Sequence, residues 1–192
     1  MKNILSIILC IFPSLLFGQN IDANKYFAHT FDNSFVKCKY GKFKGQFLKG
    51  KCNGMGILQT KDNSLYIGDF MNGEITGYGM KISTSGKQVL ANCPGAMIYV
   101  GSWNKGQKSG IGTYYDNEGK VVYHGNFLAD KPTANYPTKD AQSAKLFSVI
   151  EFSDNVTFIG ETKQGIPNGL GLVLMENGDL CQSDYKNGER CG

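Results

Sequence analysis

Glycine and aromatic residues recur in a fixed order along this chain, and that order is the strongest constraint on its fold. The clearest copy spans residues 99–112 and runs Tyr-x-Gly-x-Trp, then a glycine, then Gly-x-Gly. Residues two apart lie on the same face of a strand, so the first segment predicts a β-strand. Gly106 suits the positive φ of a tight turn. The closing Gly-x-Gly predicts a second strand whose bare face is filled by aromatic rings from a neighbouring strand.

Copies of this hairpin pattern start near residues 43, 66, 99, 123, 158 and 181. Those that start at 43, 66, 99 and 158 keep all four glycines in register. The copy at Tyr123 has Asp130 in place of the turn glycine, and the copy at Cys181 ends before its paired glycines. The wider spacings predict inserted loops near residues 86–98 and 136–148. Because a lone hairpin is marginal in water, the copies are expected to pair with one another edge to edge.

The aromatic residues at strand starts, and the glycines in register with them, are the predicted structural core of the repeats. A single layer of sheet has few other places to bury apolar area, which favours packing of the rings over the glycines. The other interpretation, a ribbon of rings that stacks on sugars or a partner peptide, stays open. The predicted core residues are Phe43, Gly45, Phe47, Tyr66, Gly68, Phe70, Gly77, Gly79, Tyr99, Gly101, Trp103, Gly110, Gly112, Tyr123, Phe127, Phe158, Gly160, Gly169 and Gly171.

This order of residues resembles the MORN repeat, which has a Tyr-x-Gly-x-Trp/Phe start, an Asn-Gly turn and a Gly-x-Gly strand. The resemblance covers roughly residues 43–192, and the copy at Tyr123 and the ends depart from it. It implies an all-β fold, an elongated single-layer antiparallel meander of about six hairpins with two inserted loops. For function it implies a scaffold, tether or dimer-forming module, with phospholipid binding proposed for some eukaryotic members, and no chemistry.

The start of the chain predicts export. Residues 1–18 have the pattern of a signal peptide, with Lys2 as the positive charge, an apolar run and Gly18 before the cut. We predict an exported, bacterial-type protein that is periplasmic or extracellular and associated with the cell envelope. Residues 19–42 are expected to cap the array at 43–192, as terminal repeats commonly do.

The cysteines add a constraint that depends on export. An odd number of cysteines in an oxidising compartment means that at least one thiol is free or links two chains. Their spacing matches no zinc signature and leaves the connectivity open. The cysteines that would remain after export are Cys38, Cys52, Cys93, Cys181 and Cys191.

Composition and motifs argue against an enzyme. A net charge of +4 does not by itself imply nucleic acid, and a hydrophobic fraction of 41% is too high for a disordered chain. The segment 45–52 comes close to a P-loop, but Cys52 stands where Ser or Thr is required, and the repeat itself produces that glycine spacing. The Asn- and Asp-rich turns lack the ligand order of a calcium loop. We therefore predict no catalytic residue, no cofactor, no metal and no nucleic-acid partner.

A cluster of lysines precedes and enters the first copy. By strand alternation, Lys42 and Lys44 oppose the face that carries Phe43 and form a short basic row. Such a row suits anionic lipid head groups, acidic glycans or phosphate. It equally suits a solvated sheet edge whose charges prevent strand-to-strand aggregation. The candidate binding residues are Lys37, Lys39, Lys42, Lys44, Lys49 and Lys51.

Two functional hypotheses follow. The first is a non-enzymatic exported scaffold that binds a protein or cell-envelope partner through its repeat sheet. The second is a peripheral binder of anionic lipid or glycan through the lysines. A homodimer is expected through the C-terminal edge strand, because the last copy ends before its second strand is complete.

Overall fold

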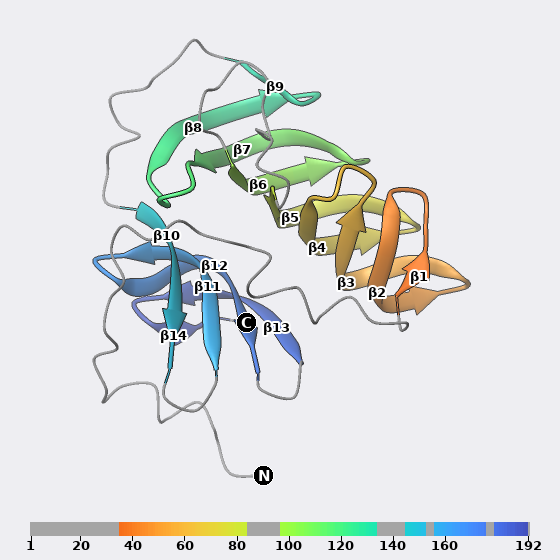
Figure 1. Ribbon diagram of the computed structural model, residues 1–192. Helices are drawn as coiled ribbons and strands as arrows, with labels where there is room; N and C mark the ends of the chain where they lie inside the picture. The colour runs from red at the N-terminus through yellow and green to blue at the C-terminus, as the bar shows by residue number, and fades with distance from the viewer. Residues whose placement is uncertain (1–34, 84–96, 134–144, 153–155, 176–178, 192) are drawn as a thin grey trace.

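The computed structural model describes residues 35–83, 97–133, 145–152, 156–175 and 179–191 of the chain (Figure 1). The predicted signal peptide, most of the predicted cap and most of both inserted loops lie outside these residues. Every regular element in the described part is a strand. The strands are β1 Val36–Lys37, β2 Gly41–Leu48, β3 Lys51–Thr60, β4 Leu65–Met71, β5 Glu74–Ile82, β6 Ile98–Asn104, β7 Gln107–Tyr115, β8 Val121–Leu128, β9 Lys131–Pro132, β10 Lys145–Glu151, β11 Thr157–Lys163, β12 Ile166–Leu174, β13 Leu180–Lys186 and β14 Glu189–Arg190.

Apart from β9 and β10, neighbouring strands in the sequence pair with each other, and every pairing is antiparallel. Strands β1 to β9 form a nine-stranded sheet, and strands β10 to β14 form a five-stranded sheet. The predicted all-β meander of hairpins is therefore confirmed. At the C-terminal end, β13 pairs with β14 over two residue pairs.

The hairpin turns follow from the sequence. Asn72 and Gly73 both have positive φ, at 54° and 87°, and Lys105 and Gly106 repeat this with 49° and 84°. Two consecutive residues of positive φ define the turn that matches the twist of paired strands. In the fourth hairpin the same two places hold Ala129 and Asp130, neither of which is glycine.

Beyond the turns, the hairpins are strongly bent. The register shifts directly after the paired glycines, for example between Gly68 and Asp69, which marks a bulge that bends the strand. Tyr40 shows how far the bend goes. Its carbonyl accepts a hydrogen bond from the Lys61 N–H, beside the β3–β4 turn, and its hydroxyl donates to Glu74, at the opposite end of β4. One residue can contact both ends only because the hairpins curve toward it.

The concave side of the nine-stranded sheet is the aromatic face. Its buried members are Phe43, Cys52, Leu58, Tyr66, Phe70, Ile75, Tyr99, Trp103, Tyr114, Tyr123 and Phe127. A Cβ atom added at Gly79 would lie 2.7 Å from Cζ of Tyr66, and one at Gly68 would lie 2.8 Å from the same atom. The ring therefore covers the glycine two residues ahead on its own strand and the paired glycine on the next strand. It does not come only from a neighbouring strand, as the sequence had suggested.

The opposite face of this sheet packs against the five-stranded sheet (Figure 1). The expected single layer is thus replaced by two packed layers. The reason lies in strands such as β4, where Leu65 and Ile67 are apolar on the face that Tyr66 does not occupy. A strand that is apolar on both faces needs cover on both. The inter-sheet core is formed by Ile57, Leu65, Ile67, Met80, Ile82, Ile98, Val100, Tyr115, Phe147, Ile159, Leu170 and Leu172.

Candidate functional site

The rings of the aromatic face touch one another in an unbroken series, which we call the aromatic ladder. Neighbouring rings meet edge to face, with centroid separations from 4.6 Å between Phe43 and Phe70 to 5.5 Å between Tyr66 and Phe70. In order, its members are Phe47, Phe43, Phe70, Tyr66, Trp103, Tyr99, Phe127 and Tyr123. All are buried except Phe47, which is 44% exposed. The ladder therefore serves as core, and little of it is open for a sugar or peptide to stack on.

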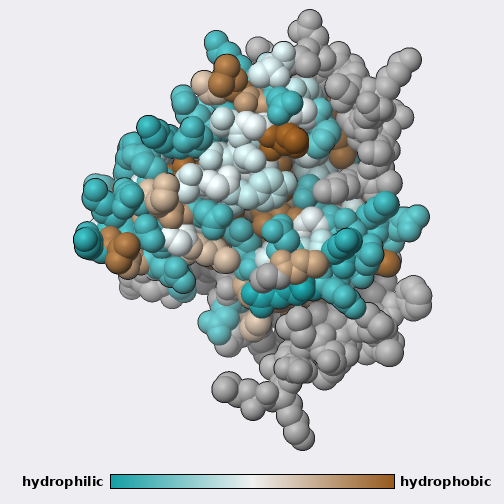
Figure 2. All heavy atoms as spheres, turned by 180° about the vertical axis from the view of Figure 1, so that it is seen from behind, coloured by the Kyte–Doolittle hydropathy of each residue, from teal (hydrophilic) through white to brown (hydrophobic). Residues whose placement is uncertain are grey.

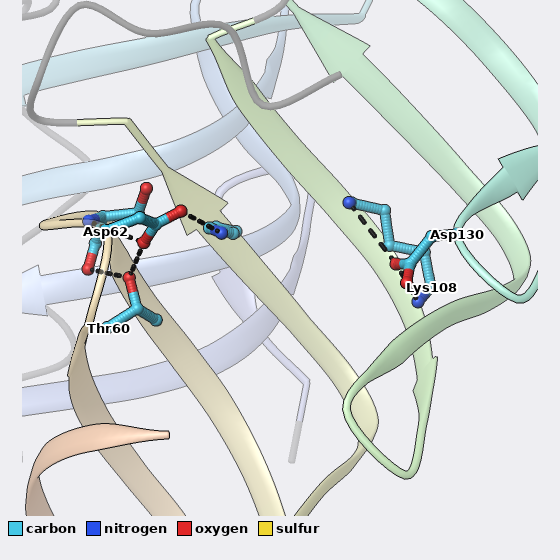
Figure 3. Close-up of polar contacts among 6 residues, drawn as sticks. Thr60, Asp62, Lys108 and Asp130 are labelled. Atoms are coloured by element: carbon cyan, nitrogen blue, oxygen red, sulfur yellow. Dashed lines mark hydrogen bonds and ion pairs between the residues drawn. The ribbon is translucent and has the colours of Figure 1, made fainter. Parts of the chain in front are cut away.

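A buried lysine interrupts this apolar face (Figure 3). Lys108 is only 7% exposed, and its Nζ lies 5.5 Å from the ring centroids of both Tyr99 and Trp103. Its Nζ also lies 3.6 Å from Oδ1 of Asp130, and the same oxygen accepts a hydrogen bond of 2.9 Å from the Lys108 N–H. Burial lowers the pKa of Lys108, and the charge of Asp130 opposes that shift. The lysine is thus stabilised by a carboxylate and by aromatic faces.

Lys108 and Asp130 both depart from the repeat pattern, and they depart together. Lys108 is the cross-strand partner of Trp103, a place that Ile75 takes in the preceding hairpin. Asp130 stands where the other described hairpins have the turn glycine, as at Gly106. Sequence reasoning noted the change at Asp130 but missed its partner. The sequence did contain a signal for this pair. A charged residue at a repeat position that is otherwise apolar needs an opposite charge nearby, and Asp130 in the next copy supplies it.

A second ion pair lies at the other end of the hairpins. Lys81 Nζ is 2.9 Å from Oδ2 of Asp62, whose other oxygen accepts hydrogen bonds from the Thr60 hydroxyl and from the Ser64 N–H at 3.2 Å (Figure 3). Burial would raise the pKa of Asp62, but the hydrogen bonds from Thr60 and Lys81 outweigh it and hold the pKa well below its usual value. This carboxylate therefore stays ionised across the physiological range and anchors the β3–β4 turn.

The structure divides the candidate lysines into two groups and a single residue, Lys39, that belongs to neither. Lys37 and Lys42 are cross-strand partners, and Lys44 lies on the same face as Lys42, so these three form a basic patch at the edge of the nine-stranded sheet. Lys49 and Lys51 lie at the β2–β3 turn, at the far end of β2. The two groups are not one continuous row.

Lys39 stands apart from both groups. Its Nζ lies 2.6 Å from a carboxylate oxygen of Glu74, and that hydrogen bond raises the pKa of Lys39. The ion pair leaves Lys39 less suited than its neighbours to hold an anionic ligand.

Exposed apolar side chains recur, one to a hairpin, at the turn end of the nine-stranded sheet. Leu48, Met71 and Leu128 are the last residues of β2, β4 and β8, and they are 56%, 57% and 69% exposed. We call these three residues the apolar rim. The equivalent residue of β6 is Asn104. Figure 2 shows how such apolar groups lie singly within a surface that is mostly hydrophilic or of intermediate hydropathy.

In the part of the chain that the structure describes, no group of three or more His, Cys, Asp and Glu side chains is placed to hold a metal ion. None of the described residues forms a helix of the length and hydropathy that a membrane crossing requires. Burial raises the pKa of Tyr66 and of Tyr99 well above the ordinary value, so these two phenols stay protonated.

The described chain is thus a helix-free repeat protein, built from glycine–aromatic hairpins that pair in sequence order. Comparison with known proteins agrees. The MORN repeat family matches this chain at residues 43–65, 66–88 and 99–121, which contain most of the hairpins β2–β3, β4–β5 and β6–β7. The chain is a MORN-repeat protein.

Curated relatives also carry this similarity. Alsin of Mus musculus and Alsin of Homo sapiens are each 33% identical to this chain, over 167 and 166 residues, which is 78% of this chain and 10% of each relative. Alsin of Rattus norvegicus is 33% identical over 114 residues, which is 54% of this chain and 6% of the relative. The chain spans about a tenth or less of the length of these relatives. The similarity therefore supports the repeat, and the activity of the whole relatives does not carry over with it.

Proposed function

We propose that this protein is a non-enzymatic, exported scaffold that binds a protein or cell-envelope partner through its repeat sheet. The apolar rim is the observation that supports the proposal most. Leu48, Met71 and Leu128 occupy the same place in three hairpins, and each is more than half exposed. Single exposed apolar residues are ordinary on a protein surface. Here the same hairpin position is apolar in three copies, so the repeat architecture places these residues in a row.

The surroundings of the rim suit a protein interface. Each rim residue has a charged cross-strand partner, and adjacent hairpins repeat at about 10 Å, twice the spacing of paired strands. An apolar centre with a charged border is the usual anatomy of a binding surface. The cross-strand partners are Lys51, Glu74 and Lys131. A partner that lies along the turns would contact one rim side chain after another.

The absence of enzymatic activity is part of the proposal. The charged side chains buried in the described core, Lys108 and Glu161, are both engaged in structural contacts. Burial raises the pKa of Tyr66 and Tyr99 and holds both in the protonated form, which makes them poor general bases. These features favour a binding role over catalysis.

Site-specific photo-crosslinking tests the rim. A photoreactive amino acid at the position of Glu74, on the same hairpin end, should crosslink a discrete partner in cell fractions of the source organism. Changing Leu48, Met71 and Leu128 to serine should remove that crosslink. The matched control changes Ile166 and Met175, exposed apolar residues of the five-stranded sheet, to serine and should leave it intact. A crosslink that persists in the rim variant would refute this interface.

A second candidate function is supported by the basic patch. The cross-strand pairing of Lys37 with Lys42 holds two like charges side by side, next to Lys44, which favours an anionic lipid head group or glycan as counter-charge. Binding to anionic and to neutral vesicles should be compared over a salt series. If this function holds, alanine at Lys37, Lys42 and Lys44 weakens anionic binding far more than alanine at Lys49 and Lys51. Equal, salt-insensitive binding by all forms would end the idea.

Export and self-association belong to the same proposal. The signal-like start of the sequence supports export, and the two-residue strand β14 leaves β13 little covered on that side, which supports pairing of two chains there. The intact mass of the secreted protein under non-reducing conditions tests cleavage and any covalent dimer. Light scattering at high concentration tests self-pairing, and a monomer would count against it.

A further inference from the structure

Two cysteine thiols lie on the aromatic face of the nine-stranded sheet, the face that does not pack against the five-stranded sheet. Cys52, near the start of β3, is buried among the members of the ladder, and Cys38, in the β1–β2 turn, packs against the same cluster and is partly exposed. After burial, the neighbouring thiol of Cys38 is the next cause that raises the pKa of Cys52, through its charge and a hydrogen bond, so the two thiols lie close together; both are free in this structure. The whole of β2 separates them in sequence, so the contact is tertiary.

The turn that carries Cys38 already crosses the concave face. The Cys38 N–H donates to the Gly41 carbonyl at 2.8 Å and closes the turn. Lys39 forms an ion pair with Glu74, and the Tyr40 hydroxyl donates a hydrogen bond to the same carboxylate. These contacts are solvent-exposed or partly so, and contacts of that kind contribute little to stability. The turn is therefore positioned over the core but held weakly.

We propose that Cys38 and Cys52 are a redox pair, and that their disulfide fastens the β1–β2 turn onto the aromatic face. A disulfide requires two sulfurs already close together, and the bent hairpins supply that proximity. The inference does not depend on the proposed binding function. It gives the oxidised protein a closed end to its core and the reduced protein a turn that can detach.

The reaction is thiol–disulfide exchange with a low-molecular-weight or protein disulfide as the oxidant. The thiolate of Cys38 attacks that disulfide, forms a mixed disulfide and releases one thiol. The thiolate of Cys52 then attacks the Cys38 sulfur, which forms the internal bond and releases the second thiol. Two protons leave the cysteines and the oxidant is reduced to two thiols, so atoms and electrons balance. Burial raises the pKa of Cys52 to about 11, which favours the accessible Cys38 as the first nucleophile.

Oxidation of the full chain by glutathione disulfide tests the pair. After alkylation of the remaining thiols and proteolysis, mass spectrometry should identify a peptide that joins Cys38 to Cys52. Modification of either residue by the alkylating agent after complete oxidation would overturn the proposal, as would a different pairing partner for either one.

Thermal unfolding tests whether the bond fastens the turn. Oxidation should raise Tm by roughly 5–10 °C, the range expected for a loop of this size. Cys38→Ser, a change at a partly exposed position, should unfold like the reduced wild type and lose the response to oxidation. Cys191→Ser, at an exposed cysteine outside the pair, should keep the response. An unchanged Tm in the oxidised wild type, or an equal response in Cys38→Ser, would refute the fastening.

Discussion

The two sheets are built from the same hairpin but bury it in different ways. In the nine-stranded sheet, the aromatic ladder covers the concave face from Phe47 to Tyr123. The ring of Tyr99 contacts three other rings, those of Trp103, Tyr114 and Phe127, with centroids 5.1–5.3 Å away. In the five-stranded sheet, Phe158 has one described ring partner, Tyr185, at 5.2 Å. The place that Trp103 holds in its hairpin is taken there by Thr162.

The five-stranded sheet compensates by packing on its neighbour. Its side chains Phe147, Ile159 and Leu172 enter the inter-sheet core. Glu161 is buried in the same region and accepts hydrogen bonds from the Tyr115 hydroxyl at 2.6 Å and from the Leu170 N–H at 3.0 Å. The two sheets therefore show that the repeat can be stabilised by contacts between aromatic rings of the same sheet or by packing of a second sheet against it. We therefore expect the nine-stranded sheet to be the more autonomous of the two.

Truncating the central ring of each sheet should give the largest difference. Tyr99→Ala removes a buried ring with three ring neighbours, and we expect a loss of about 4–5 kcal/mol in the free energy of unfolding. Phe158→Ala removes the equivalent ring from a sheet with one such neighbour and should cost about 3 kcal/mol. Urea unfolding, followed by the fluorescence of Trp103, measures both. Equal losses would show that the ladder adds nothing beyond burial of each ring.

Removing the buried carboxylate between the sheets should have the next largest effect. Glu161→Ala leaves the Tyr115 hydroxyl and the Leu170 N–H without this acceptor, and we expect a loss of about 2–3 kcal/mol. Hydrogen exchange should show faster exchange in β11 and β12 than in β4 to β7, because the bond joins the weaker sheet to the stronger one. Tyr115→Phe is the matched control, since it removes only the donor. The double variant should then lose less than the two single losses combined, and simple additivity would contradict a direct bond.

The sequence predicts the parts of this fold that depend on local order. Alternation of aromatic and glycine residues determines each hairpin, and the glycine at the second turn position determines its turn, so strands β2 to β7 follow from the pattern. The second layer is a long-range property. It required reading Leu65 and Ile67 as a second apolar face, together with Pro132, which has no N–H to donate to a further strand beside β9. The local order of residues alone does not reveal that the strands divide into two sheets after β9.

The candidate site was less predictable than the fold, for a related reason. The bulges bend the hairpins, and the bend brings Lys39 to Glu74 and Cys38 to Cys52, although strand alternation places each pair far apart. A flat sheet would have kept the lysines in one row. Lys108 and Asp130 required a comparison between copies, because each residue looks unremarkable within its own hairpin.

Changes at Lys108 and Asp130 should alter the free energy of unfolding moderately. Removing only the charge of Asp130 should lower it, and replacing both residues by those of the regular hairpins should raise it. Asp130→Asn removes the charge that faces the buried Lys108 and should destabilise the protein by about 1–3 kcal/mol. The double change of Lys108→Ile and Asp130→Gly installs the residues of the regular hairpins. It should stabilise the protein by about 1–2 kcal/mol, because an ion pair with one buried partner is replaced by apolar packing and a strained turn is relieved.

Denaturant unfolding of the four forms, wild type, two single variants and the double variant, separates these contributions. Lys108→Ile alone is the informative control, since it leaves Asp130 at an exposed turn and should cost little. If the double variant is less stable than wild type, the ion pair contributes net stability and the aromatic face depends on it.

Acidification should produce the smallest effect, at the ion pair between Asp62 and Lys81. Because the pKa of Asp62 is lower in the folded protein than in the unfolded chain, its contribution is fully present above pH about 4 and decreases as the pH falls toward the folded value. Asp62 is more than half exposed, so the contribution is about 0.2–1 kcal/mol at neutral pH after solvent screening. The stability difference between wild type and Asp62→Asn should therefore shrink steadily below pH 4, and Lys81→Met should reduce that slope. A difference independent of pH would mean that Asp62 acts only through its turn hydrogen bonds, which an asparagine can also make, and that charge plays no part in holding the β3–β4 turn.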